Sequence, residues 1–170
     1  MRLIERDVNP KLRDEVRILG AMRVPIVVFF TDNGRCYRVK VHEIPQGGRL
    51  AKGKAIVNLL HFAEGEHLTT VLTVPTFEPG RYVIMATRNG TVKKTDLMAF
   101  SRPRAGGIIA LSLVAGDELI TVRITDGTQN VFLSSAQGKS IRFHESDIRP
   151  SGRVARGERW ARRSRSTTSR

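Results

Sequence analysis

The chain has 170 residues, of which 29 are Lys or Arg and 16 are Asp or Glu, so its formal net charge is +13 at neutral pH. A chain of this length forms about one domain, and so large a basic excess attracts polyanions, nucleic acid before anionic membrane. A single cysteine, Cys36, excludes an internal disulfide and a cysteine-based zinc site. No apolar run reaches the roughly 18 residues of a membrane span. We therefore predict a soluble, cytoplasmic protein without a membrane partner.

The N-terminal segment, residues 1–22, is predicted to contain one short helix. Leu12, Val16 and Leu19 recur at spacings of three or four residues, which places them on one face of a helix. The pattern then changes, and residues 23–157 form a separate predicted domain.

Residues 23–157 alternate between short apolar, β-branched stretches and turns. Seven stretches are predicted strands, each with Gly, Asp or Asn nearby: VPIVVFF, AIVNLL, LTTVLTV, RYVIMAT, GIIALSL, ELITVRI and NVFLSS. We therefore predict an all-β fold.

Three predicted hairpin turns, TDNGR, TRNGT and SAQGK, recur about fifty residues apart and align on Gly34, Gly90 and Gly138. The first two contain Asn-Gly, a pair that tolerates positive φ. A basic, glycine-containing loop follows each hairpin: GGRLAKGK, SRPRAGG and SGRVARG. The repeated unit is strand, hairpin, strand, basic loop, strand, strand, which matches one four-stranded blade of a propeller-like array.

A basic residue stands four positions after each hairpin glycine, at Arg38, Lys94 and Arg142. Residues and loops that recur on equivalent edges of an array form a curved basic rim, and glycine lets the backbone come close to a bulky ligand. Such a rim suits a long polyanion better than a small one.

At these residues the chain resembles the C-terminal region of the bacterial DNA gyrase A protein and, less closely, its topoisomerase IV counterpart. The resemblance runs from about Ile26 to Gly157, through TDNGRCYRVKVHEIP, KGKAIVNLL, VIMATRNGTVKKTDLMAF, GDELITV and SAQGKSIRFHESDIRP. It implies a β-pinwheel, a ring of about six four-stranded blades that exchange strands with their neighbours and wrap DNA around the outer edge. In that family, wrapping presents a DNA segment in a chosen chirality and so supports ATP-dependent negative supercoiling.

The resemblance implies double-stranded DNA as a partner, together with the core of the gyrase A protein and with the gyrase B protein in the parent enzyme. The predicted DNA-binding residues belong to the hairpin strands and the basic loops: Arg38, Lys40, Arg49, Lys52, Lys54, Lys93, Lys94, Arg102, Arg104, Arg142, Arg153 and Arg156. Their contacts are expected to go to phosphates without reading bases, so affinity should depend on salt.

Two features depart from the family pattern. The Gln-Arg-Arg-Gly-Gly-Lys-Gly heptad of the family's first blade is absent, and the loops here are similar to the degenerate versions of later blades. After Gly157 the third repeat continues as ERWARRS instead of an apolar strand. We therefore expect a gene fragment with about two complete blades and a partial third in an incomplete ring, ending in a basic disordered tail over residues 158–170.

Catalysis is not expected from this chain. The four histidines occur singly, phosphate-binding glycine motifs of the Walker and Rossmann types are missing, and Tyr37 and Tyr82 fall in predicted strands. We predict no catalytic residue, no metal and no cofactor, and the resemblance implies an accessory region of a type II DNA topoisomerase without its catalytic domains. Two alternatives stay open: a propeller-like protein interaction module whose charge is incidental, and a non-functional gene fragment.

Overall fold

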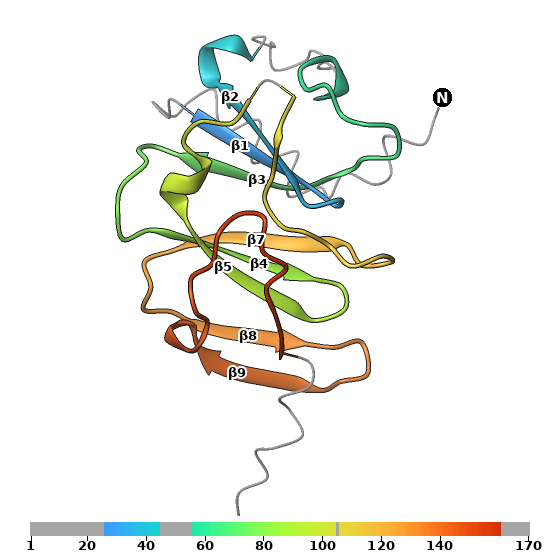
Figure 1. The fold of residues 1–170 in the computed structure, drawn as a ribbon, viewed down its shortest axis with the longest axis vertical. Coiled ribbons are helices and arrows are strands. Elements are labelled where there is room, and N and C mark those ends of the chain that lie inside the picture. Colours follow the sequence, from blue (N-terminus) through green and yellow to red (C-terminus); the bar gives the residue numbers. More distant parts are fainter. Residues whose placement is uncertain (1–25, 45–55, 105, 161–170) are drawn as a thin grey trace, which may run out of the picture.

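A computed structural model of the chain describes residues 26–44, 56–104 and 106–160 (Figure 1). The elements in this part of the chain are strands and short 3₁₀ helices (η): β1 (Ile26–Thr31), β2 (Arg35–Lys40), η1 (Val41–Glu43), η2 (Ile56–Asn58), β3 (Leu68–Val74), β4 (Tyr82–Thr87), β5 (Thr91–Asp96), η3 (Leu97–Phe100), β6 (Ile108–Ile109), β7 (Leu119–Thr125), β8 (Asn130–Ser134), β9 (Ser140–His144), η4 (Glu145–Asp147) and β10 (Glu158–Arg159). The all-β prediction is confirmed. The helix predicted within residues 1–22 lies outside the described residues.

In the described part of the chain, two four-stranded sheets and one two-stranded sheet are stacked along the long axis of the molecule (Figure 1). Blade 1 has the strand order β3-β1-β2-β6, blade 2 has the order β10-β5-β4-β7, and the third hairpin consists of β8 and β9. This arrangement confirms the predicted array of two complete blades and a partial third.

Each blade takes its fourth strand from the following repeat. In blade 1, Ile108 of β6 lies opposite Cys36 of β2; in blade 2, Glu158 of β10 lies opposite Val92 of β5. The two pairings have the same register relative to the hairpin glycine of their blade. Neighbouring repeats therefore exchange strands, as the resemblance implied.

One predicted strand is a 3₁₀ helix instead. The stretch AIVNLL contains η2, Ile56–Asn58, which belongs to no sheet of the described residues. The strand at this point of a repeat pairs with the preceding blade, and the described residues hold no such blade. An apolar stretch at this position therefore forms a strand only where an earlier hairpin supplies an edge.

The predicted disordered tail does not begin at residue 158. Glu158 and Arg159 form β10, and the following Trp160 is 3% exposed. The predicted disordered tail therefore does not include residues 158–160, and its remaining residues, 161–170, lie outside the described part of the chain. A β-ladder is made by backbone groups, so an edge strand with exposed, charged side chains can occupy the place where an apolar strand was expected.

The three hairpin turns share one geometry. In each, the glycine N–H donates to the carbonyl three residues earlier at 3.0 Å, and the glycine φ lies between 76° and 77°. No described residue other than glycine has a positive φ, so Asn33 and Asn89 do not use the left-handed region that was expected of Asn-Gly. Glycine alone meets the conformational demand of these turns.

The stacked sheets bury residues on both of their faces. Phe30 of β1 lies in a core between the blades together with Met85 of β4, whereas the adjacent Phe29 lies in a second core on the opposite face, with Leu60. A third core joins blade 2 to the third hairpin, where the rings of Phe143 and Trp160 are stacked with centroids 3.9 Å apart. Because adjacent residues of a strand point to opposite faces, every central strand here contacts two neighbouring layers.

Candidate nucleic-acid interface

The basic residue four positions after the hairpin glycine has a different environment in each repeat. Arg38 is half-buried, and its Nη1 donates to the Ser101 carbonyl. Lys94 is 4% exposed, and its Nζ donates to the Glu145 carbonyl at 3.2 Å. Arg142 is exposed. In the first two repeats this position therefore connects a blade to the segment that follows the next hairpin, and only in the third does it face solvent.

Lys94 belongs to a buried polar cluster. Its Nζ lies 3.7 Å from Oε2 of Glu145, a carboxylate with no exposed surface, and 4.4 Å from the centroid of the Tyr82 ring. The same carboxylate accepts hydrogen bonds from the Thr125 hydroxyl and the Gln129 N–H, each at 2.7 Å. The charge of Lys94 is thus compensated inside the protein.

Lys93 points to the opposite face of β5, toward blade 1. It is 1% exposed, and its Nζ donates to the carbonyls of Ala110 at 2.7 Å and of Arg153. Burial, and to a lesser extent the nearby Arg153 charge, lowers the pKa of Lys93 to about 8. Interior ammonium groups do not reach a duplex, so the expectation that Lys93 and Lys94 contact DNA is corrected and both are left out of the candidate interface.

Exposed arginines occur on the loops between blades, on the third hairpin and on β10: Arg102, Arg104, Arg142, Arg149, Arg156 and Arg159. Within the described part of the chain, ion pairs join His67 to Asp32, Arg88 to Glu118 and Lys94 to Glu145, so none of these exposed arginines is paired with a described carboxylate. Uncompensated positive charge on a surface attracts polyanions.

The sequence prediction missed two of these arginines. Arg149 precedes the loop SGRVARG, and Arg159 was assigned to the tail. The repeat alignment contained the signal for Arg159, because this residue pairs with Thr91 at the point where Ile109 pairs with Arg35.

Among the other predicted residues, Lys40 is exposed at the end of β2 and Arg153 is half-buried. The basic residues of the first loop, Arg49, Lys52 and Lys54, lie outside the described residues. They stay predictions.

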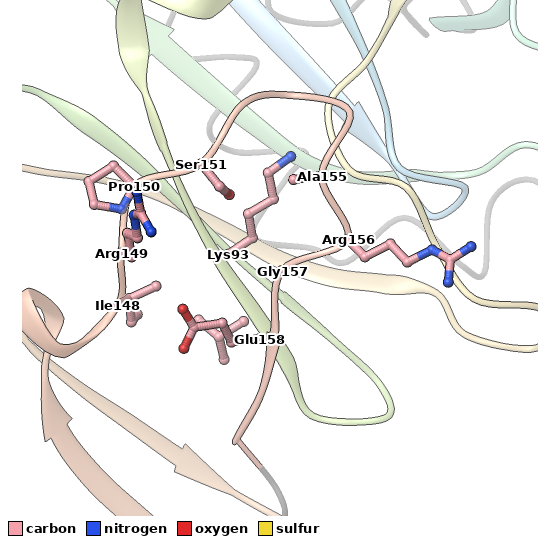
Figure 2. Close-up of a pocket in the computed structure, with 10 residues that line it drawn as sticks. Lys93, Ile148, Arg149, Pro150, Ser151, Ala155, Arg156, Gly157 and Glu158 are labelled. Carbon is pink, nitrogen blue, oxygen red and sulfur yellow. The ribbon is translucent and has the colours of Figure 1, made fainter.

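The loop 149–157 arches over β5 and encloses a hollow of about 440 Å³ (Figure 2). Lys93 rises beneath the arch toward Ala155, and the guanidinium of Arg156 points away from the hollow (Figure 2). The loop ends at Gly157, with φ 86°, where an added Cβ would lie 2.7 Å from the Val92 carbonyl oxygen. Only glycine fits there, which fixes the point at which the loop rejoins blade 2.

Two acidic residues hold the hairpin turns. The Glu66 carboxylate accepts from the Thr31 hydroxyl at 2.5 Å and from the Tyr37 hydroxyl at 2.9 Å, and Asp117 accepts from the Thr87 hydroxyl at 2.7 Å. Burial, followed by the hydrogen bond to Glu66, raises the pKa of Tyr37. Tyr37 is a structural donor in this arrangement.

The described residues also bear on metal binding and on membrane crossing. Over residues 26–44, 56–104 and 106–160, no three His, Cys, Asp or Glu side chains are placed to hold a metal ion. Nor do these residues include a helix long and apolar enough to cross a membrane. Burial raises the pKa of the Cys36 thiol to about 12.

Comparison with known proteins gives a consistent result. A family model described as DNA gyrase C-terminal domain, beta-propeller, matches residues 25–75, 81–126 and 129–159. The DNA gyrase A protein of Klebsiella oxytoca is 46% identical over 153 residues, which cover 88% of this chain and 18% of that protein. The gyrase A protein of Salmonella typhimurium is 48% identical over 143 residues, which cover 84% and 16%. The chain thus spans less than a fifth of the length of these relatives.

Solved structures of two C-terminal domains have a similar fold. The crystal structure of the C-terminal domain of DNA topoisomerase IV has a TM-score of 0.74 and 29% identity, and the match covers 79% of this chain and 42% of that one. The structure of a DNA gyrase A C-terminal domain has a TM-score of 0.65, with coverage of 81% and 43%. Its identity is 19%, so it shows the fold alone.

Proposed function

Because the chain belongs to the family of DNA gyrase C-terminal, beta-propeller domains, we propose that it binds double-stranded DNA without sequence preference and bends it along its basic loops. The chain is homologous to part of the gyrase A protein of a type II topoisomerase. DNA binding by this chain is our proposal beyond that homology.

One observation carries the proposal: six exposed arginines of the loops, the third hairpin and β10 have no carboxylate partner in the described part of the chain. The loops 101–107 and 149–157 follow successive hairpins, and each returns to the preceding blade. Their arginines therefore recur from one blade to the next, as the phosphates of a duplex recur along its backbone.

The expected contacts go from guanidinium groups to phosphate oxygens, which position a duplex but carry no sequence information. Each neutralised phosphate releases counterions, so affinity should fall steeply with salt. Bending a site of 20–30 base pairs by 40–90° costs about 1 to 6 kcal/mol, which these contacts must offset. Two blades supply only a short arc, so we expect bending rather than a full wrap.

In the parent enzyme, we propose that this region acts with the core of the gyrase A protein and with the gyrase B protein to support ATP-dependent negative supercoiling. The chain would then be an accessory region that catalyses no reaction by itself and works in the cytoplasm beside the DNA. The identity to gyrase A proteins supports a gyrase parent over topoisomerase IV.

The test is a titration of random-sequence duplex DNA at several salt concentrations. Replacing Arg102, Arg104 and Arg156 by Ala together should weaken binding to every duplex. It should also reduce the slope of log affinity against log salt by up to about 2.7, since each phosphate contact contributes about 0.9. End-labelled duplexes in the same titration report bending through energy transfer.

The matched control replaces three exposed basic residues outside the loops 101–107 and 149–157, Arg81, Arg123 and Lys139, which form no ion pair with a described carboxylate, so that the loss of charge is equal. This control should change the slope much less. Equal effects of the two triple variants would show that only net charge matters. Absence of binding by the folded wild-type chain at low salt would reject the proposal and favour the protein interaction module.

A further inference from the structure

The turn at residues 152–155 forms the tip of the loop 149–157. The backbone carbonyls of three consecutive residues, 153 to 155, accept hydrogen bonds from other parts of the protein. The Ala155 N–H donates to the Gly152 carbonyl at 3.1 Å and closes the turn. The Lys93 ammonium donates to the carbonyl of residue 153, the Ser112 hydroxyl to that of residue 154 at 2.6 Å, and the Ser112 N–H to that of residue 155 at 3.4 Å.

One donor belongs to blade 2, and the other to the segment that leads from β6 of blade 1 to β7 of blade 2. Lys93 lies on β5 of blade 2, and the same ammonium also donates to the carbonyl of Ala110, the residue that follows β6 of blade 1. Ser112 follows Ala110 by two residues. Together the donors fix the turn at the junction of the two blades, where the arch of the loop reaches toward blade 1 (Figure 1).

Both ends of the loop are fixed as well. The Ser151 N–H donates to the Lys94 carbonyl at 2.9 Å, and the close approach of Gly157 to Val92 sets the other end. The carbonyls of residues 153–155 are therefore directed inward, whereas Val154 at the tip is 67% exposed, Arg153 is half-buried and Arg156, just after the turn, is exposed.

We propose that Lys93 and Ser112 are positioning residues for DNA binding: they hold the turn 152–155 in one conformation so that the arginines of the loop meet the duplex together, and neither touches DNA. A loop that is already ordered loses less conformational freedom when it binds. The inference rests on the proposed function, since it assigns these residues to the same DNA-binding loop.

This role differs in a measurable way from the phosphate contact first expected of Lys93. A phosphate contact adds about 0.9 to the salt slope, whereas a positioning residue changes affinity and leaves the slope almost unchanged. Ser112 allows a clean comparison because its replacement changes no charge.

The experiment measures duplex binding and trypsin cleavage of Ser112→Ala and Lys93→Met in the full chain. Without DNA, trypsin should cut after Arg153 and Arg156 faster in both variants than in the wild type, because the turn opens more often. Loss of one hydrogen bond predicts about two- to tenfold weaker DNA binding by Ser112→Ala, at an unchanged salt slope. Ser134→Ala, an exposed serine of β8, is the matched control and should change neither measurement.

A double-mutant cycle separates positioning from a general structural effect. In a chain that already carries Arg149→Ala, Arg153→Ala and Arg156→Ala, Ser112→Ala should no longer weaken DNA binding, because the side chains that it positions are gone. An equal loss with and without those arginines would overturn the inference, as would a slope that falls by about 0.9 in Lys93→Met. If the wild-type chain fails to bind DNA, the proposed function is rejected instead. If trypsin cuts Ser112→Ala and Lys93→Met no faster than the wild type, the positioning of the turn is rejected, whether or not the chain binds DNA.

Discussion

Blade 2 and the third hairpin arise from successive copies of one repeat, yet they differ in how much of each strand is buried. Four of the six residues of β5 are buried, whereas of the five residues of β9 only Phe143 is. The hairpin turns are the same, with glycine φ of 77° and 76°. The comparison shows that a local motif fixes the turn, while burial depends on a sheet having neighbours on both faces and both edges.

The same comparison explains the fate of equivalent charges. Lys94 and Arg142 occupy the same position of the repeat, but Lys94 is covered by the segment after the third hairpin and forms an ion pair with Glu145. No described segment covers Arg142 in that way, and it is exposed. A positive charge in this repeat is structural where a neighbouring layer is present and free to bind a partner where the layer is absent.

Hydrogen exchange should give the largest difference between the two regions. Amides of residues 81–95 in blade 2 should exchange only on global unfolding, at about 5 kcal/mol or more, whereas those of residues 129–145 should exchange through local opening of a two-stranded sheet. Mass spectrometry of the monomeric protein measures both segments at once. Equal protection of the two segments would contradict the conclusion that the third hairpin opens more easily than blade 2.

Removal of the buried Glu145 carboxylate tests the contact between blade 2 and the segment after the third hairpin. Glu145→Ala leaves the Lys94 ammonium in the interior without its partner and should lower the free energy of unfolding by about 3 to 5 kcal/mol. Urea denaturation followed by circular dichroism measures this change. Arg142→Ala, at the exposed equivalent of Lys94, is the control and should change stability by less than about 0.5 kcal/mol.

The hairpin glycines sharpen the comparison, because Gly34 and Gly138 have the same φ of 76°. An added Cβ at Gly34 would meet the Leu111 carbonyl oxygen, whereas at Gly138 it meets no atom within 4 Å. Gly138→Ala should therefore cost only the left-handed strain of about 1 to 2 kcal/mol, and Gly34→Ala about 2 kcal/mol more. Thermal unfolding of the two variants measures the difference. Equal losses of stability would mean that the segment around Leu111, just after β6, moves aside at little cost.

The buried amine of blade 2 predicts a pH dependence that the third hairpin lacks, since Ile141 stands where blade 2 has Lys93. With a pKa of about 8 in the folded state against an ordinary 10.5, Lys93 is neutral between these values when folded and protonated when unfolded. The unfolded state then binds more protons, so stability should rise by about 1 to 3 kcal/mol as the pH increases from 8 to 10.5. Denaturation of Lys93→Met across this window should show a smaller rise. The same rise in both proteins would assign it to other groups.

The all-β class, the three hairpins and the repeat follow from the amino-acid pattern alone, because they depend on signals within a few residues: alternating apolar side chains and a glycine at each turn. Glycine spacing placed Gly34, Gly90 and Gly138 correctly in equivalent turns. The charged strand β10 was missed because its pairing uses backbone groups that leave no apolar pattern in Glu158 and Arg159.

Which basic residues are free to bind a partner depends instead on how the sheets pack against one another. Lys93 and Lys94 are adjacent and chemically identical, yet they point to opposite faces of β5 and are covered by different layers, one through Ala110 and Arg153, the other through Glu145. These partners lie between 17 and 60 residues away along the chain. Contacts over such separations depend on how the sheets stack, and a charge pattern read along one strand does not contain that information.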